Sequence, residues 1–246
     1  MDEYNAECCT EFPLPEGEVY CKIAQTEDGE TFVVTCNPIL RRVHQTIPQS
    51  AELVFIDATS NVDRNDTKLL HLVCPSVVGG LPLADILCTR EDTETIHFAL
   101  ELLKTVLPTD AFYGRGCELG PCLFMTDDSD SIRSSLSASW PQAELLLCQF
   151  HVLQALWNWL WEGKHNIANP DRPILLRLFR DVLYSENEEQ LFDNMEKLNV
   201  SLVFHQYPNF QADLFPRIHA WSLEHRVRNM LPTSNNNTTN LVETSF

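Results

Sequence analysis

The chain has 246 residues, 44% of them hydrophobic, and carries 17 Lys and Arg against 35 Asp and Glu, a net charge of −18. This length and hydrophobic content suffice for one large domain or two small ones, and they exclude disorder throughout. A surface this acidic repels nucleic acid over most of its area, so any contact with DNA must be local or assisted by metal ions. The sequence has no apolar run near the roughly 18 residues that span a bilayer, which predicts a protein outside the membrane.

The N-terminus and the cysteines predict an intracellular protein with reduced thiols. The first residues, MDEYNAECCTEF, have neither the basic nor the apolar region of a secretory signal, so we expect no secretion. There are nine cysteines, an odd number, and Cys74 and Cys148 lie inside apolar runs. This pattern favours buried, reduced thiols over a disulfide framework.

The first part of the chain is acidic and then changes character. Residues 1–16 are predicted to form a flexible, solvated arm, because blocks of like charge repel each other. Residues 17–51 are predicted to form a hairpin that turns at residues 27–29, followed by a short helix at 38–43 with Asn37 as its cap. The first 20 residues hold no Lys or Arg and six acids, namely Asp2, Glu3, Glu7, Glu11, Glu16 and Glu18.

Residues 52–151 read as three strands followed by alternating helices and strands. The run LVFIDAT is followed by TKLLHLVC and LPLADILC, with Gly79–Gly80 between the last two, which predicts an antiparallel meander. From Asp92, apolar residues recur at helical spacing until Pro108, and a strand (CLFMTD), a short helix (129–139) and a last strand (AELLLC) follow. The order βββαβαβ is that of the ribonuclease H fold, so the predicted class is α/β with a ribonuclease H-like mixed sheet.

The remainder of the chain has helical periodicity. Residues 152–232 are predicted to form an all-helical insertion, on the pattern of HVLQALWNWL, PILLRLFRDVL and EEQLFDNMEKL. Residues 233–246 read as a polar loop followed by the first turn of a truncated C-terminal helix.

Asp57 and Asp127 are the first candidate site residues. Asp57 lies within LVFIDAT, where an ionised carboxylate must be paired, hydrogen-bonded or metal-bound to offset desolvation. Asp127 ends CLFMTD in a similar way, and strand alternation lets only one of Asp127 and Asp128 share a face with Asp57. The structural alternatives are a strand-end turn of Asp57 with Thr59 and Ser60, and a helix-capping or turn role for Asp127.

Cys148 and His151 form a C-x-x-H step between the last strand and a helix rich in tryptophan. A zinc site would need a second pair of ligands, and Cys117 with Cys122 has suggestive spacing. Cys122 begins its strand whereas Cys148 ends the neighbouring parallel one, so roughly 15 Å or more would separate them. We therefore expect no zinc, and we interpret Cys148 as a buried thiol, with His151 directed toward the carboxylates or packed beneath them.

Taken together, five stretches resemble the transposase domain of Mutator-like elements. The resemblance runs from about residue 18 to the end of the chain, in the order of the family, and the helical block before Asn240 resembles the insertion that the family carries before its last acid. The matching stretches are LVFIDAT, GLPLADILCTREDTETI, LFMTDDSDSIRSSL, CQFHVLQALWNWL and TTNLVETSF.

The resemblance implies that Asp57, Asp127 and Glu243 form a DDE triad. Three carboxylates repel one another unless cations compensate them, and the triad would hold two Mg²⁺ or Mn²⁺ ions, which prefer oxygen ligands. Such a site cuts and joins DNA strands by in-line displacement at phosphorus. The resemblance gives the C-x-x-H step a structural or DNA-organising role without metal. For Glu243 the residues also allow a capping box, with Asn240 as the cap.

The resemblance also implies the partners of the protein and its activity in isolation. DNA, as transposon ends and target, is the expected partner. A DNA substrate implies a nuclear protein, and without it the expected location is the cytoplasm. The chain could also form a homo-oligomer. The chain lacks the family's zinc-finger DNA-binding module, so a separate module or partner is expected. Because the helix that carries Glu243 stops at Phe246, we expect the chain alone to be inactive. Glu224 is the next candidate for the third acid.

Two other functions stay open. The first is a catalytically silent, transposase-derived binding protein that acts through its helical block and acidic surface. The second is a ribonuclease H-like nuclease unrelated to transposition. Metal binding by the acids distinguishes an active site from the silent alternative.

Overall fold

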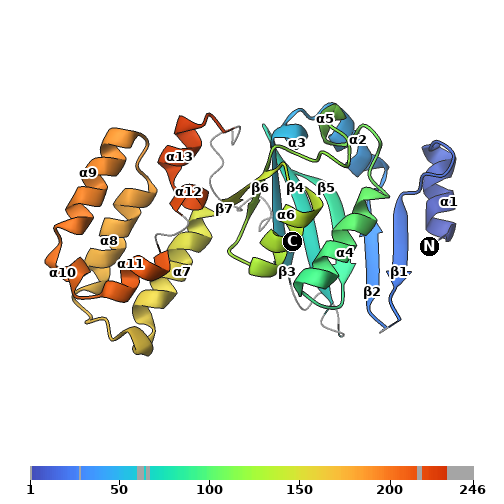
Figure 1. Ribbon diagram of the computed structural model, residues 1–246. Helices are drawn as coiled ribbons and strands as arrows, with labels where there is room; N and C mark the ends of the chain where they lie inside the picture. Colours follow the sequence, from blue (N-terminus) through green and yellow to red (C-terminus); the bar gives the residue numbers. More distant parts are fainter. Residues whose placement is uncertain (1, 28, 60–63, 65–66, 215–217, 232–246) are drawn as a thin grey trace. The chain divides into compact units, whose positions relative to one another are not determined.

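The computed structural model describes residues 2–27, 29–59, 64, 67–214 and 218–231. These residues form two compact units that divide between Leu145 and Leu146 (Figure 1). The first unit is built on a β-sheet, and the second is helical. Of the helices in these ranges, none combines the length and the apolar character that crossing a membrane requires.

The sheet is mixed and has seven strands in the order β1-β2-β5-β4-β3-β6-β7. Neighbours from β1 to β3 pair antiparallel, whereas β3 and β6 are parallel. The predicted α/β class and the succession of three strands, helix, strand, helix and strand are confirmed, and the predicted N-terminal hairpin extends the same sheet. The strands are β1 (Cys21–Gln25), β2 (Thr31–Thr35), β3 (Leu53–Thr59), β4 (Lys68–Ser76), β5 (Gly79–Cys88), β6 (Leu123–Thr126) and β7 (Glu144–Leu147).

Helices cover one face of this sheet. α4 (Thr93–Lys104) and α6 (Asp130–Ser139) lie side by side over it (Figure 1), and α2 (Pro38–Thr46) contacts β5. The short helices α3 (Gln49–Glu52) and α5 (Ala111–Gly114) lie next to α2. Because strand side chains alternate between faces, the even-numbered strand residues meet the apolar sides of the helices. This core includes Val34, Val54, Ile56, Leu70, Leu72, Ile86, Ile96, Leu100, Leu103 and Leu136.

Side-chain caps fix the starts of the predicted helices. Asn37 Oδ1 accepts hydrogen bonds from the backbone N–H groups of Ile39 and Leu40, at 3.0 and 3.1 Å. Asp92 accepts from the N–H of Thr95 at 3.0 Å. Each cap satisfies donors that the first turn of a helix leaves without partners, so both predicted start points are confirmed.

A helix, α1 (Asp2–Glu11), stands where the sequence predicted a flexible arm. Its Asn5 side chain donates to the carbonyl of Cys21 and accepts from the N–H groups of Tyr20 and Cys21, all at 3.0 Å. The Tyr20 hydroxyl donates to the carbonyl of Phe12 at 2.6 Å. Hydrophobic patterning could not predict this helix, because hydrogen bonds from Asn5, and not a buried apolar face, hold it against β1.

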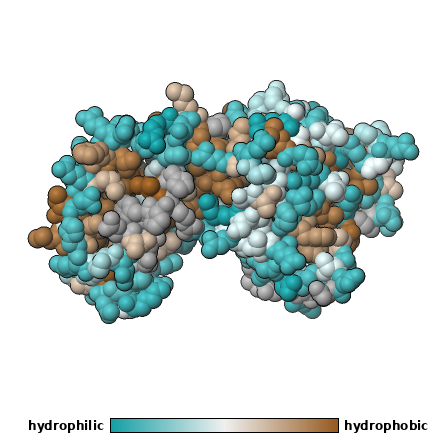
Figure 2. Space-filling model, viewed as in Figure 1, coloured by the Kyte–Doolittle hydropathy of each residue, from teal (hydrophilic) through white to brown (hydrophobic). Residues whose placement is uncertain are grey.

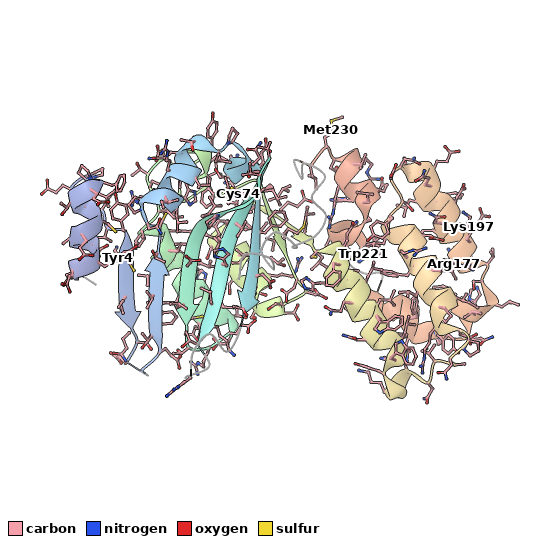
Figure 3. All side chains as sticks on the ribbon, turned by 180° about the vertical axis from the view of Figure 1, so that it is seen from behind. Tyr4, Cys74, Arg177, Lys197, Trp221 and Met230 are labelled. Carbon is pink, nitrogen blue, oxygen red and sulfur yellow. The ribbon has the colours of Figure 1, made fainter. Side chains whose placement is uncertain are left out.

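The second unit confirms the predicted helical block. Its core contains Leu156, Leu175, Phe179 and Trp221. The ring centroids of Phe179 and Trp221 lie 4.9 Å apart, and Trp221 is labelled in Figure 3. Hydrophobic residues also reach the surface over α9 and α10 (Figure 2), where Leu202 is 80% exposed. The helices are α7 (Gln149–Trp161), α8 (Arg172–Leu183), α9 (Glu188–Asn199), α10 (Leu202–His205), α11 (Pro208–Leu214), α12 (Ile218–Trp221) and α13 (Leu223–Arg228), with a 3₁₀ turn at Gly163–His165.

Candidate functional site

A row of polar side chains crosses the sheet on the face opposite to α4 and α6. Asp57 of β3 pairs with His71 of β4, His71 pairs with Asp85 of β5, and Asp85 pairs with Thr35 of β2. Directly paired residues of neighbouring strands point to the same face. Since the neighbouring residue Ile56 faces the core under the helices, the four polar side chains point to the other side of the sheet.

A β-bulge in β5 creates this alignment. The pairs from Ser76 with Gly79 to Val73 with Pro82 follow one register, whereas Leu72 pairs with Ala84. Leu83 is therefore an extra residue in β5, and it shifts the pairing of the later residues of β5 with β4 by one position. Without the bulge, His71 would lie opposite Ala84, and Asp85 would point into the core. Pro82 fits such a position because it has no N–H to donate to the ladder.

The turn of this hairpin differs from the prediction. The sequence placed the turn at Gly79–Gly80, but both glycines belong to β5, and Val77 and Val78 form the two-residue loop. Both valines are exposed, and Gly79 has a φ of +120°, a backbone conformation that glycine adopts without steric cost. The glycine pair thus predicted the hairpin correctly but placed its turn two residues too far along the chain.

Within the row, His71 and Asp85 form a hydrogen-bonded pair through Nδ1 and Oδ1. Their side chains are 12% and 33% exposed, so the imidazole is largely buried and the carboxylate is half-buried. Asp57, next to His71, accepts a hydrogen bond from the N–H of Ala58 at 2.9 Å. Asp57 thus lies inside a paired strand that continues to Thr59, and the strand-end turn with Thr59 and Ser60 does not describe it, although Ser60 itself lies outside the described residues.

Asp127 follows β6 directly, one residue past the end of the strand that pairs with β3 on the side away from β4. β3 and β6 are parallel, with Phe55 paired to Met125. Extended by two residues past this last pair, the register would place Asp127 level with Asp57 and on the same face. Asp127 is half-buried, whereas Asp128 is exposed, in line with the expected alternation.

Asp127 also has the local role that the sequence left open. Its Oδ1 accepts a hydrogen bond from the N–H of Ser129 at 3.2 Å, which is a turn interaction. Ser129, not Asp127, caps α6, because its hydroxyl accepts from the N–H of Ile132 at 3.4 Å. The turn fixes the direction of the carboxylate, so this local role is compatible with one at a site.

The remaining predicted acids do not join the row among the described residues. Glu243 lies outside the described residues. Glu224, the alternative third acid, is buried in the second unit, on α13, where its Oε1 lies 3.3 Å from Nη1 of Arg228. Within the described ranges, no group of three or more His, Cys, Asp or Glu side chains is placed to hold a metal ion.

The C-x-x-H step belongs to the second unit. Cys148 is buried and precedes α7, and His151 is half-buried on its first turn. Two side chains tie this end of α7 to the C-terminal helices: Gln149 donates to the carbonyl of Trp221 at 3.1 Å, and Arg226 donates to the carbonyl of Leu147. Burial lowers the pKa of Arg226 to about 10, opposed by the nearby Cys148. The surroundings of Cys148 are those of a structural core position.

Three further cysteines are buried thiols. Burial raises the pKa of Cys36 and Cys74 to about 12 and that of Cys88 to about 11, so all three stay protonated at neutral pH. Cys74, labelled in Figure 3, lies on β4 within the sheet. Because the thiolate is the reactive form, none of these residues is suited to nucleophilic catalysis.

Sequence reasoning missed His71 and Asp85. A signal was present, since each is a polar residue inside an apolar strand, in LLHLVC and LPLADILC. Simple counting from the hairpin turn, however, puts Asp85 on the opposite face from His71. Only the bulge at Leu83 brings them together, and the sequence pattern did not reveal it.

No family model matches this chain, and no curated protein matches it.

Proposed function

We propose that this protein is a ribonuclease H-like domain that binds divalent metal ions at Asp57 and Asp127 and cuts and joins DNA strands, as a transposase of the Mutator-like type. The order of strands and helices supports the ribonuclease H-like fold, because three antiparallel strands precede a parallel strand that pairs with the first. The five sequence stretches that resemble Mutator-like transposases support the reaction.

The observation that carries the proposal is the parallel register of β3 and β6. Extended by two residues, this register would bring the carboxylates of Asp57 and Asp127 level on the face of the sheet opposite to α4 and α6. Two nearby carboxylates repel each other, and a shared cation removes this cost. Mg²⁺ and Mn²⁺ prefer such oxygen ligands, so the donors present fit these ions.

The candidate site residues have different proposed roles. Asp57 and Asp127 would hold the metal ions, each with its carboxylate oriented by a backbone N–H, from Ala58 and Ser129. Bound ions of this kind activate the attacking oxygen and stabilise the leaving oxygen at phosphorus. Glu243 is the proposed third ligand. Cys148 and His151 have a structural role in the second unit, and zinc is not part of the proposal.

A DNA-binding measurement tests the proposal. A fluorescein-labelled DNA duplex should bind in the presence of Ca²⁺, which supports binding without catalysis, and lose binding when EDTA removes the ion. Asp57→Asn and Asp127→Asn should each weaken binding by at least about tenfold, or 1.4 kcal/mol. Asp128→Asn removes the same charge from an exposed position and should bind like the unmodified chain. Equal binding by all three variants would contradict the site.

Strand cleavage separates the enzyme from the silent binding protein. The same duplex is incubated with Mn²⁺ and the chain, both as it stands and with about 15 helix-forming residues added after Phe246. Cleavage that is lost on Glu243→Gln supports the transposase. Metal-dependent binding without cleavage favours the silent, transposase-derived binding protein.

A further inference from the structure

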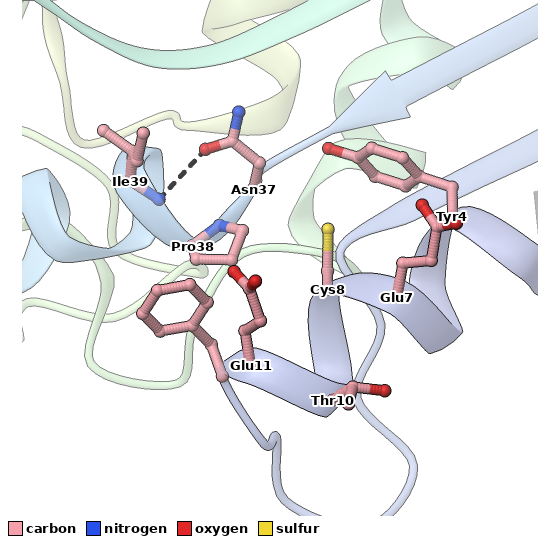
Figure 4. Close-up of a pocket in the computed structure, with 9 residues that line it drawn as sticks. Tyr4, Glu7, Cys8, Thr10, Glu11, Asn37, Pro38 and Ile39 are labelled. Carbon is pink, nitrogen blue, oxygen red and sulfur yellow. Dashed lines mark hydrogen bonds between the residues drawn. The ribbon is translucent and has the colours of Figure 1, made fainter.

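A groove runs along the first unit between α1 and α2. Two cavities, of about 600 and 790 Å³, share Phe12, Pro38 and Ile39 as lining residues and so form one continuous hollow. Each volume falls in the range of about 300–1,000 Å³ that is typical of ligand sites. In Figure 4 the side chains of Tyr4, Cys8 and Glu11 extend from α1 toward Asn37 and Pro38 across the first cavity.

The groove exposes large apolar side chains. Ile39, in the first turn of α2, is 72% exposed, and Phe12, at the end of α1, is 53% exposed. Leu14 and Pro15 line the second cavity. An apolar surface gathered in a hollow, with polar residues around it, is the usual form of a protein–protein interaction site.

Hydrogen bonds hold both walls of the groove in place. Asn5 fixes α1 to the backbone of β1, and the Tyr20 hydroxyl fixes the carbonyl of Phe12. Beneath the second cavity, Arg41 pairs with Glu18 at 2.6 Å and donates to the carbonyl of Val106 at 2.7 Å. A preformed groove binds more tightly than one that must be ordered on binding, because less conformational entropy is lost.

The charged residues around the groove determine the charge of a partner that can bind there. Glu7 and Glu11 line the first cavity, without any Lys or Arg among its lining residues. In the second cavity Glu18 and Asp110 face Arg41 and Arg42, and Arg41 is already paired with Glu18. The first 20 residues contain six acids and no Lys or Arg. The acidic rim of the first cavity, beside the exposed Phe12 and Ile39, favours a basic partner with apolar side chains and disfavours DNA.

We infer that this groove is a docking site for a basic amphipathic peptide segment of a partner protein. An apolar side chain of the peptide lies between Phe12 and Ile39, and Lys or Arg side chains lie beside Glu7 and Glu11. A second copy of this chain fits poorly, since the protein carries a net charge of −18 and would bring acidic surfaces together.

A peptide titration tests this inference. The probe is a fluorescein-labelled peptide of about 12 residues made of Lys and Leu, with leucines three and four positions apart so that they share one helix face. Its controls are a peptide with Glu at every Lys position and a peptide of Lys alone. Fluorescence anisotropy with the full chain should show binding of the Lys–Leu peptide at least about tenfold tighter than of either control.

Variants locate the binding. Ile39→Ser, and Glu7→Gln combined with Glu11→Gln, should each weaken binding by at least about tenfold. The matched controls are Val77→Ser, at a fully exposed valine elsewhere, and Glu188→Gln combined with Glu189→Gln on α9; neither should change binding. Equal loss in the control variants, equal binding of the Lys-only peptide, or a dimer in sedimentation that Ile39→Ser dissociates would overturn the inference.

Discussion

Asp57 and His71 lie inside paired strands, where polar side chains cost free energy unless they find partners. His71 is largely buried, and its hydrogen bond to Asp85 offsets part of the free-energy cost of burying a polar side chain. An apolar residue in place of Asp57 or His71 would stabilise the sheet more. Polar residues at such positions, on one face and in one line, are therefore the basis of the proposed site.

His44 gives a prediction for the pH dependence of stability. It is fully buried, its Nδ1 accepts a hydrogen bond from the N–H of Phe112 at 3.2 Å, and burial lowers its pKa to about 4. Nearby Arg41 lowers this pKa further, and Asp110 opposes the shift. Because the unfolded chain takes up a proton first, stability is lost as the pH falls from about 6.5 through about 4.

Urea unfolding at pH 7 and pH 4.5 measures this effect. His44 should account for a loss of roughly 2–3 kcal/mol between the two values, from 1.36 kcal/mol per unit of pKa. His44→Leu should be less stable at pH 7 and should lose less than the unmodified chain on acidification. His205→Gln, at an exposed histidine, is the control and should keep the full loss. An unchanged loss in His44→Leu would show that other groups titrate.

At the scale of elements, the cap of α2 gives a direct prediction. Asn37→Ala removes the acceptor for two backbone N–H groups and should lower the free energy of unfolding by about 1 kcal/mol. Asn37→Asp keeps an acceptor and should stay within about 0.5 kcal/mol of the unmodified chain. Urea unfolding at neutral pH measures both. An equal loss in the two variants would contradict the capping role, because aspartate keeps both the shape and the acceptor oxygen of asparagine.

Elements with strong local signals could be predicted from the sequence. The run around Asp57, the helix capped by Asp92 and the helical block after residue 151 all appear as expected. α1 was missed because it has no buried apolar face, and polar contacts such as those of Asn5 attach it to the sheet. The alignment of His71 with Asp85 was missed because it depends on one extra residue, Leu83, and register is a property of two strands together.

The site was predictable to a similar extent. Asp57 and Asp127 stood out as acids at apolar strands, and the parallel pairing of β3 with β6 follows from the strand order. His71 and Asp85 required the register of a bulged hairpin. Cys148 is buried, as the apolar run before it predicted, whereas the hydrogen bonds of Gln149 and Arg226 nearby could not be inferred from the sequence.

At the scale of the whole molecule, the negative charge is concentrated in one part of the chain. Residues 1–145 carry 24 Asp and Glu against 9 Lys and Arg, whereas residues 146–246 carry 11 against 8. The sheet unit thus attracts cations, and it repels DNA except where bound ions reverse the local charge. This division supports metal-assisted contact with DNA and the docking of a basic peptide on the same unit.

The most direct test of the account is a calorimetric titration of the chain with Mn²⁺. The account predicts a site of millimolar affinity or tighter that weakens by at least about tenfold in Asp57→Asn and in Asp127→Asn. Asp128→Asn, which removes the same charge from the adjacent exposed position, should leave the affinity unchanged. If all three variants bind Mn²⁺ equally well, or if the unmodified chain binds none, Asp57 and Asp127 do not form a metal site.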